Sequence, residues 1–302
     1  MSTTLKLGFL RVLEKMGKSS LVSESVFGFP YRISLGDMFS ENPYYNNYSN
    51  VGEILACAAW VNNADKPVIY DIGAHCGFIS TQLACILKKQ SPVIIAFEPI
   101  PPTYTDLILS IEQFNLEGTI RPIPVALSNS IGMVRMNYSK WASMFAQIEH
   151  DAMQTNNRSG SKYFNVLTMP LDHIMDGLGV PSVVKIDVEG WEVPVLQGVQ
   201  QHMKEGKLKK TAWCLEWNPE ALRQTGYSKQ EFFEVLPEYR YYYLNDYEGQ
   251  LIPLLQEVPD PLVLDHVCNL FAIHTSSTRH ESWKENFDVL KEMYGVAVSE
   301  RS

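Results

Sequence analysis

The clearest hydrophobic pattern in the chain is a series of short apolar runs, each followed by a turn and a helix-like repeat. Val68–Ile72 and Val93–Phe97 contain no glycine or proline and are rich in β-branched residues, which predicts buried strands. After the first run, apolar residues recur at helical spacing at Phe78, Ile79, Leu83, Ile86 and Leu87. A buried strand, a glycine turn and an amphipathic helix form the first half of a nucleotide-binding βαβ unit, so the pattern predicts an α/β fold.

Further runs extend this alternation over most of the chain. Strands are predicted at Thr119–Leu127, Gly132–Tyr138, Phe164–Met169, Val183–Ile186, Thr211–Glu216, Tyr239–Leu244, Gln250–Leu255 and Cys268–His274. Helices are predicted at Leu5–Met16, Gly52–Asn62, Tyr104–Phe114, Ser228–Leu236 and His280–Tyr294. Pro122 and Pro124 lie two residues apart, so both missing N–H groups face one side, which fits an outer edge strand.

Two stretches lack a clear period. Phe27–Asn50 is rich in Tyr, Phe, Pro, Gly and Asn, and we interpret it as an ordered loop. Residues 1–50 are predicted to be an N-terminal extension and a candidate lid, with Tyr45 contacting substrate; alternatively, the aromatic residues pack against the sheet edge. Residues 51–302 are predicted to be one domain. Its polar loop 139–162 is long enough to suggest a functional or disordered segment, so we expect Ser143 and Met144 to contact substrate.

The composition is that of an ordinary globular protein, with 45% hydrophobic and 20% charged residues among 302. The formal net charge of −9 disfavours nucleic acid as a partner. The five cysteines are scattered without C-x-x-C spacing, which predicts free thiols in a reducing compartment and no structural zinc. The sequence shows no signal peptide and no run of about 20 apolar residues, so we expect a cytoplasmic location and no membrane span.

The first candidate chemistry lies in the turn after the first strand. Gly73 and Gly77 can adopt backbone angles that other residues avoid, and they let a ligand approach the main chain. Glu98 ends the second strand, where a carboxylate can accept hydrogen bonds from two ribose hydroxyls. The turn lacks the middle glycine of G-x-G-x-x-G, which brings backbone against a pyrophosphate. A nucleoside ligand that has a ribose but no phosphates fits better, and S-adenosylmethionine is the common ligand of that kind. The alternative is an ordinary strand–turn–helix crossover that binds no ligand.

Acidic residues follow the fourth and fifth main strands, at the sheet edge where ligands bind in open α/β folds. Asp187, Glu189 and Glu216 are the candidate catalytic residues, because a carboxylate there can accept the proton of a substrate hydroxyl or orient it. Each has a structural alternative: Asp187 or Glu216 could pair with Lys185, and Glu189 could cap the next helix. The trio could also bind a magnesium-type cation, but the spacing is not diagnostic and we predict no metal.

Several motifs, in this order, resemble those of the FkbM-family methyltransferases. They are Asp71-Ile-Gly-Ala-His-Cys-Gly77, Phe97-Glu-Pro99, Leu171-Asp172, Lys185-Ile-Asp-Val-Glu-Gly-Trp-Glu192 with Leu196-x-Gly198, and Glu216. The resemblance runs from about residue 50 to 218. His75 departs from the family, which often has Asn at this position, and a changed donor there could alter contacts to the cofactor.

The resemblance implies a fold, a cofactor and a reaction. The family has the Rossmann-like class I methyltransferase fold: a seven-stranded, mostly parallel sheet in the order 3-2-1-4-5-7-6, with strand 7 antiparallel and helices on both faces. Members commonly use S-adenosylmethionine to methylate hydroxyls, which implies O-methylation of a small natural product or a glycan, as in secondary metabolite biosynthesis. The expected cofactor-binding residues are Asp71, Gly73, Ala74, His75, Gly77, Glu98, Pro99, Ala126, Leu127 and Asp187. Trp191 is expected to contact the substrate.

Three other functions are alternatives. The methyl acceptor could be a carboxylate or an amine on a peptide or another metabolite. A nicotinamide-dependent oxidoreductase is disfavoured by the missing middle glycine. A non-catalytic binding module would keep the fold and bind the cofactor, and it would lose no function in the variants Asp187→Asn or Glu216→Gln.

Overall fold

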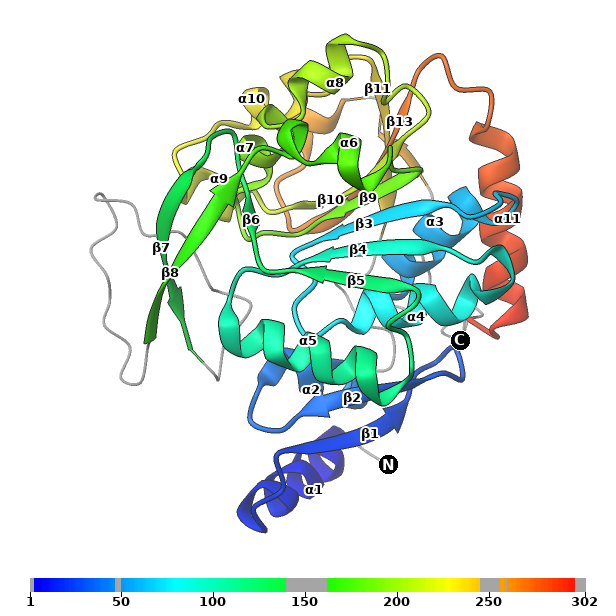
Figure 1. The fold of residues 1–302 in the computed structure, drawn as a ribbon. Coiled ribbons are helices and arrows are strands. Elements are labelled where there is room, and N and C mark those ends of the chain that lie inside the picture. The colour runs from blue at the N-terminus through cyan, green and yellow to red at the C-terminus, as the bar shows by residue number, and fades with distance from the viewer. Residues whose placement is uncertain (1–2, 47–49, 140–161, 245–255, 259, 297–302) are drawn as a thin grey trace.

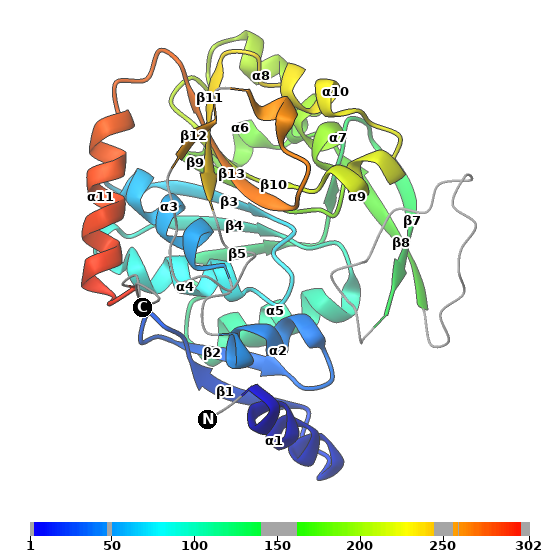
Figure 2. The same ribbon diagram turned by 180° about the vertical axis from the view of Figure 1, so that it is seen from behind.

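The centre of the protein is an eight-stranded mixed sheet with helices on both faces (Figures 1 and 2). The computed structural model describes residues 3–46, 50–139, 162–244, 256–258 and 260–296. Along the sheet, the strands follow in the order β12 (Gln256–Val258), β11 (Tyr239–Leu244), β13 (Cys268–His274), β10 (Ala212–Trp217), β9 (Val183–Ile186), β3 (Val68–Ile72), β4 (Val93–Phe97) and β5 (Ile120–Ile123).

The sheet corrects the predicted strand count. Eight strands are present rather than seven, because β12 pairs antiparallel with β11, as in the register of Tyr242 with Glu257. An edge strand offers unpaired N–H and C=O groups, and β12 satisfies those of β11. The strands are parallel from β10 to β5, whereas β13 is antiparallel to both of its neighbours, so the sheet is mixed. The predicted strand Gln250–Leu255 lies outside the described residues.

The central parallel strands β3, β4 and β9 are buried on both faces, which explains their mainly apolar sequences. Successive side chains point to opposite faces, so Ile69 packs into one hydrophobic layer and Tyr70 into the other. One layer is covered by α3 (Val51–Val61), α4 (Phe78–Ile86), α5 (Pro101–Gln113) and α11 (His280–Met293). The other is covered by α6 (Met175–Leu178), α7 (Glu192–Gln197), α9 (Pro219–Gln224) and α10 (Lys229–Glu234). Among the helices that the structure describes, none has the length and hydrophobicity to cross a membrane.

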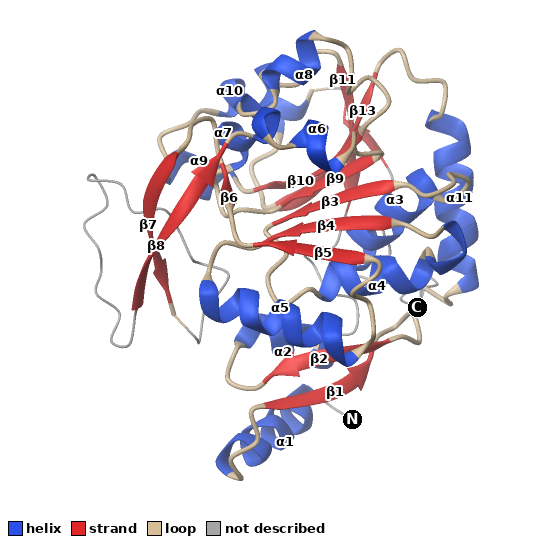
Figure 3. Ribbon diagram, in the orientation of Figure 1, coloured by secondary structure: helices blue, strands red, loops and turns tan. Residues whose placement is uncertain are grey.

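The predicted strand Thr119–Leu127 divides at its prolines. β5 lies at the edge of the main sheet, as the prolines predicted, and its ladder with β4 reaches Ile123. The chain then leaves that sheet, and β6 (Ala126–Leu127) pairs with β8 (Lys162–Met169). Together with β7 (Gly132–Tyr138), these strands form a three-stranded sheet in the order β6-β8-β7, which lies to one side of the main sheet (Figure 3).

The N-terminal residues have more regular structure than predicted. The expected first helix is present as α1 (Thr3–Lys15), and it is followed by β1 (Ser20–Glu24). The prediction of a loop from residue 27 to residue 50 is wrong, because β2 (Pro30–Ser34) and α2 (Met38–Tyr45) lie within it. α2 contains Pro43 and many polar residues, which hides the helical period in the sequence.

The hairpin of β1 and β2 is attached to the helices that follow the first two strands of the main sheet. Arg32 Nη1 lies 2.7 Å from Asp106 Oδ1 on α5, and the ring of Tyr31 meets that of Phe78 edge to face. These contacts hold α2 at the carboxyl ends of the central strands, where it lines the cavity described below.

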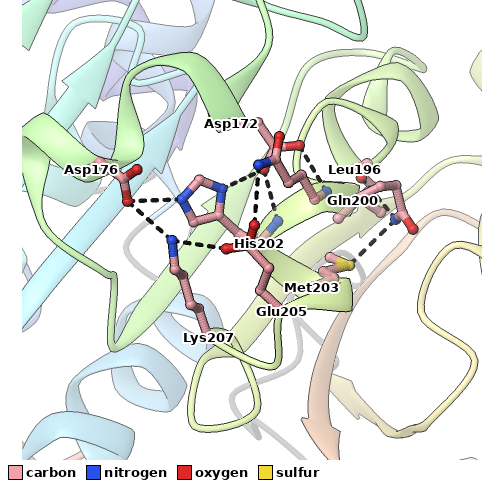
Figure 4. Close-up of polar contacts among 9 residues, drawn as sticks. Asp172, Asp176, Leu196, Gln200, His202, Met203, Glu205 and Lys207 are labelled. Carbon is pink, nitrogen blue, oxygen red and sulfur yellow. Dashed lines mark hydrogen bonds and ion pairs between the residues drawn. The ribbon is translucent and has the colours of Figure 1, made fainter.

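A buried histidine links the short helices on the other face (Figure 4). His202 lies in α8 (Gln200–Lys204), and its Nδ1 is 2.5 Å from Asp172 Oδ1, while its Nε2 is 3.0 Å from Asp176 Oδ1. Asp172, in the 3-10 turn η3 (Leu171–His173), also accepts the backbone N–H of Gln201 and of His202. Burial opposes a charge on His202, but hydrogen bonds to Asp176 and Asp172 raise its pKa above the usual value. The remaining 3-10 turns are η1 (Lys88–Gln90) and η4 (Pro261–Val263).

We expect His202→Phe to lower the free energy of unfolding by about 1–3 kcal/mol at pH 6, because Asp172 loses a buried partner. Because the pKa of His202 is raised in the folded state, its stabilising effect is complete below about pH 6.5 and is lost as pH rises through the folded value. Urea unfolding at pH 6 and pH 9 measures the difference, with the exposed His173→Phe as control. An equal effect at both pH values would contradict a charged His202.

Candidate functional site

A cavity of about 290 Å³ lies at the carboxyl ends of β3, β4 and β9, where ligands bind in open α/β sheets. The sheet edge and its loops contribute Gly73, Ala74, His75, Glu98, Pro99, Asp187 and Glu189. The N-terminal extension contributes Phe39, Asn42, Pro43, Asn46 and Asn50. A smaller cavity of about 40 Å³ continues from the first, and both are lined by Gly73, Pro99, Met136, Val188 and Glu189.

The glycine turn is shaped by close contact with the neighbouring strand. Gly73 has a φ of +78°, and a Cβ at this position would lie 1.9 Å from the backbone oxygen of Asp187. The N–H groups of Gly73 and Ala74 both donate to Phe97 O at 3.0 Å. Gly77 has a φ of +85° and precedes α4, but it does not line the cavity. The first glycine therefore shapes the site, and the second ends the turn.

Lys185 connects the turn to the acidic edge of the sheet. Its Nζ donates to Gly73 O at 3.0 Å and lies 3.5 Å from both Asp71 Oδ1 and Asp187 Oδ2. Burial opposes the charge, but Asp187 and Asp71 outweigh it and raise the pKa of Lys185. Asp71 is fully buried and also accepts a hydrogen bond from Ser80 Oγ. Asp71 therefore supports the site from beneath and does not line the cavity.

Glu98 is held rigidly at the end of β4. Its Oε2 accepts the N–H of His75 at 3.0 Å, and its Oε1 accepts the N–H of Ile100 at 2.9 Å. Burial raises the pKa of Glu98, although His75 and these two hydrogen bonds oppose the shift. His75 Nε2 in turn lies 3.5 Å from Asp37 Oδ2, which connects the turn to the N-terminal extension.

The three predicted catalytic acids lie together. Asp187, Glu189 and Glu216 each offer a carboxylate oxygen, and these oxygens lie within 4.8 Å of one another. Glu189 and Glu216 are buried. Burial, followed by the charges of Asp187 and Glu192, raises the pKa of Glu189 to about 9. Glu216 lies opposite Asn269 in the ladder of β10 with β13, and Asn269 lines the cavity.

Some of the other predicted site residues line a cavity and others do not. Ala126, Leu127 and Trp191 line the smaller cavity. Tyr45 lines neither cavity, and its hydroxyl donates to Met38 O at 3.2 Å. The predicted substrate contacts Ser143 and Met144 lie outside the described residues.

The sequence reasoning missed residues that shape the site. Glu192 Oε1 accepts the N–H groups of Val188 and Gly190, so it fixes the loop that carries Glu189. Burial raises the pKa of Glu192 to about 7. An acid in the first turn of the predicted helix was the available signal, because such an acid often accepts N–H groups of the preceding loop. For Asn269, within an apolar strand, the sequence carried no comparable signal.

The arrangement separates three kinds of chemistry. The smaller cavity is lined mainly by apolar side chains and suits a flat apolar ring system. Glu98 offers a carboxylate of fixed orientation, which suits paired hydroxyl donors. Asp187, Glu189 and Glu216 offer negative charge, which suits a proton, an ammonium group or a metal cation.

We expect Gly73→Ala to lower the free energy of unfolding by about 3 kcal/mol or more, because its Cβ would collide with the backbone of Asp187 at a positive φ. Gly118→Ala is the matched control, since a Cβ at that exposed glycine meets no atom within 4 Å. Chemical denaturation of both variants measures the difference. Equal stability of the two variants would show that the turn and β9 are not in this close contact.

Comparisons with known proteins were consistent with one another. Among solved structures, the chain is similar to a methyltransferase FkbM from Methylobacillus flagellatus KT, with 16% identity, a TM-score of 0.42, and coverage of 69% of this chain and 44% of that chain. It is also similar to SAH-bound PaMTH1 from Podospora anserina, with 10% identity, a TM-score of 0.39, and coverage of 73% and 76%. At TM-scores below 0.5, neither likeness is evidence for a ligand or a reaction.

The sequence comparisons are more informative. The hexuronic acid methyltransferase AglP of Haloferax volcanii is 31% identical over 137 residues, which are 45% of this chain and 51% of the relative. The chain thus spans about half the length of that curated relative. The model of the methyltransferase FkbM domain matches residues 71–243, which is more than half of the chain. The chain therefore belongs to the FkbM methyltransferase family.

Proposed function

We propose that this protein transfers a methyl group from S-adenosylmethionine to a hydroxyl of a sugar-containing acceptor, either a glycan or a small natural product. One observation carries the proposal: Glu98, fixed by two backbone N–H groups, lines the same cavity as the Gly73 turn and the acids Asp187 and Glu189. Family membership supports methyl transfer. The name of the curated relative, a hexuronic acid methyltransferase, supports a sugar acceptor.

The residues present fit this cofactor. Glu98 would accept hydrogen bonds from the two ribose hydroxyls, and Gly73 would let the nucleoside approach the main chain, since a Cβ is excluded there. Leu127 and Phe97, in the smaller cavity, would pack against the adenine ring. Asp187 would accept a hydrogen bond from the amino acid ammonium group. When bound, the cofactor supplies a methyl group that is already activated by a positively charged sulfur.

The chain then has two tasks, which are to position the acceptor and to remove its proton. A hydroxyl must be held in line with the methyl group at about 3–3.5 Å. Asp187 and Glu189 line the cavity, and Glu216 offers a carboxylate oxygen within 4.8 Å of theirs. These acids would orient the hydroxyl and accept its proton. The proposed lid, α2, would exclude water, since it contributes Phe39 and Pro43 to the lining.

A carboxylate acceptor is the second candidate, because a hexuronic acid carries a carboxylate as well as hydroxyls. The three neighbouring acids disfavour it, since an anionic nucleophile would be repelled by them. They favour a neutral hydroxyl, which needs the proton acceptor that they offer.

We expect Glu98→Gln to weaken S-adenosylmethionine binding about 10- to 100-fold, because an amide replaces the charged acceptor of the ribose hydroxyls. Isothermal titration calorimetry of wild type and variant measures the loss, and the exposed Glu112→Gln on α5 serves as control. Absence of cofactor binding by the wild type would contradict the proposed function. Equal affinity of wild type and Glu98→Gln would show that Glu98 does not bind the ribose hydroxyls.

The product and its pH dependence provide a separate test. Incubation with S-adenosylmethionine and a panel of sugars, hexuronic acids and glycans should add one methyl, detected by mass spectrometry, that survives mild alkali as an ether does. The rate should rise with pH towards about 9, because Glu189 has a pKa of about 9 and must lose its proton before it accepts another. We expect Asp187→Asn to lower turnover about 100-fold or more.

Two outcomes would point elsewhere. An alkali-labile product would indicate a methyl ester and thus a carboxylate acceptor. Unchanged function of Asp187→Asn and Glu216→Gln, with cofactor binding retained, would indicate a non-catalytic binding module.

A further inference from the structure

We propose that Asp187, Glu189 and Glu216 form a binding site for a divalent cation of the magnesium type. The site lies at the carboxyl ends of β9 and β10, and two of its acids, Asp187 and Glu189, line the main cavity. The inference concerns these side chains alone, and it does not depend on the identity of the methyl donor or acceptor.

The carboxylate oxygens of the three acids are spaced closely enough to share one ion. One carboxylate oxygen from each residue lies within 4.8 Å of the others. Hard cations bind protein oxygens at about 2.0–2.6 Å, so two ligands of one ion lie at most about 4–5 Å apart. The three acids therefore need little movement to share one ion.

One carboxylate oxygen of this cluster lacks a hydrogen-bond partner among the described residues. Glu189 is 7% exposed and lines both cavities. Its Oε1 is buried and has no hydrogen-bond partner among the residues that the structure describes. A buried carboxylate oxygen without a partner is costly. A cation between the three acids would supply that partner.

The acids of this cluster carry more negative charge than the nearby cationic side chains balance. Of the described residues that line the main cavity, Lys185 is the one lysine or arginine, and its Nζ is shared between Asp187 and Asp71. His75 is the other cationic side chain of the lining, since its pKa is raised to about 10, but its Nε2 lies 3.5 Å from Asp37 Oδ2. The charge of Lys185 alone does not balance Asp187, Glu189 and Glu216. Either a proton or a cation can relieve this repulsion.

The donor atoms select the kind of ion. All three residues offer carboxylate oxygens, and Asn269, which is buried and lines the cavity beside Glu216, can add an amide oxygen. Such a set suits Mg²⁺, Mn²⁺ or Ca²⁺, whereas zinc prefers sulfur and nitrogen ligands. The remaining ligand positions would face the cavity, where water or neighbouring hydroxyls of a sugar could occupy them.

The direct test is titration of Mn²⁺ or Mg²⁺ alone into the full chain at pH 8, without any methyl donor. We expect one ion per chain by calorimetry and by electron paramagnetic resonance of Mn²⁺. Glu189→Gln and Glu216→Gln should each weaken binding at least 10-fold, because each removes one charged ligand. The exposed Glu205→Gln, near the end of α8, is the matched control and should bind as the wild type does.

Thermal unfolding separates loss of the site from loss of the fold. Mn²⁺ should raise the Tm of the wild type but not that of Glu189→Gln. Near-ultraviolet circular dichroism verifies that each variant is folded.

The proposal fails if Mn²⁺ does not bind at millimolar concentration, or if both Gln variants bind it as the wild type does. In that case the acids share protons rather than a metal ion. Because no methyl donor is present, this failure is distinct from a failure to bind S-adenosylmethionine.

Discussion

The site depends on one buried positive charge. Lys185 is 3% exposed, and its ammonium group reaches the glycine turn through Gly73 O, the first strand through Asp71 and the acidic edge through Asp187. A buried charge is tolerated only when it is paired and hydrogen-bonded, and removing one partner of such a pair costs about 3–5 kcal/mol. These three contacts therefore fix β3, the turn and the end of β9 relative to one another. The positions of the groups proposed to bind the ligand depend on this arrangement.

The acidic residues at the cavity are of two kinds: a single anchored carboxylate, Glu98, and the cluster of Asp187, Glu189 and Glu216. Glu98 is anchored by two backbone N–H groups and is the carboxylate placed to hold hydroxyls. The acids at the other edge are packed closely enough to raise the pKa of Glu189 to about 9, with burial as the largest cause. Such a cluster is unstable unless it receives a proton, an ammonium group or a metal ion. The same charge excess therefore underlies the proposed proton acceptor and the proposed cation site.

The sequence predicted the parts of the fold whose signal is local. β3, β4 and β9 are buried on both faces, so their apolar runs were unambiguous, and the paired prolines placed β5 at the sheet edge. α2 was missed because Pro43 and its polar neighbours hide the helical period. The sequence offered a lid as one of two alternatives for this segment and could not decide between them, because long-range contacts such as Arg32 with Asp106 hold it in place.

The same limit applies to the site. The acids near the carboxyl ends of β9 and β10 were predicted because residues at the carboxyl ends of neighbouring strands converge. Asp71 was predicted to bind cofactor, but it lies beneath the turn and holds Lys185 and Ser80. A sequence does not distinguish a carboxylate that lines a cavity from one that supports it.

The most direct test of the account is a crystal structure with S-adenosylhomocysteine. The account predicts the ribose hydroxyls on Glu98 and the amino acid ammonium group on Asp187; a nucleoside bound elsewhere, or a Glu98 carboxylate turned away from the ribose, would contradict it.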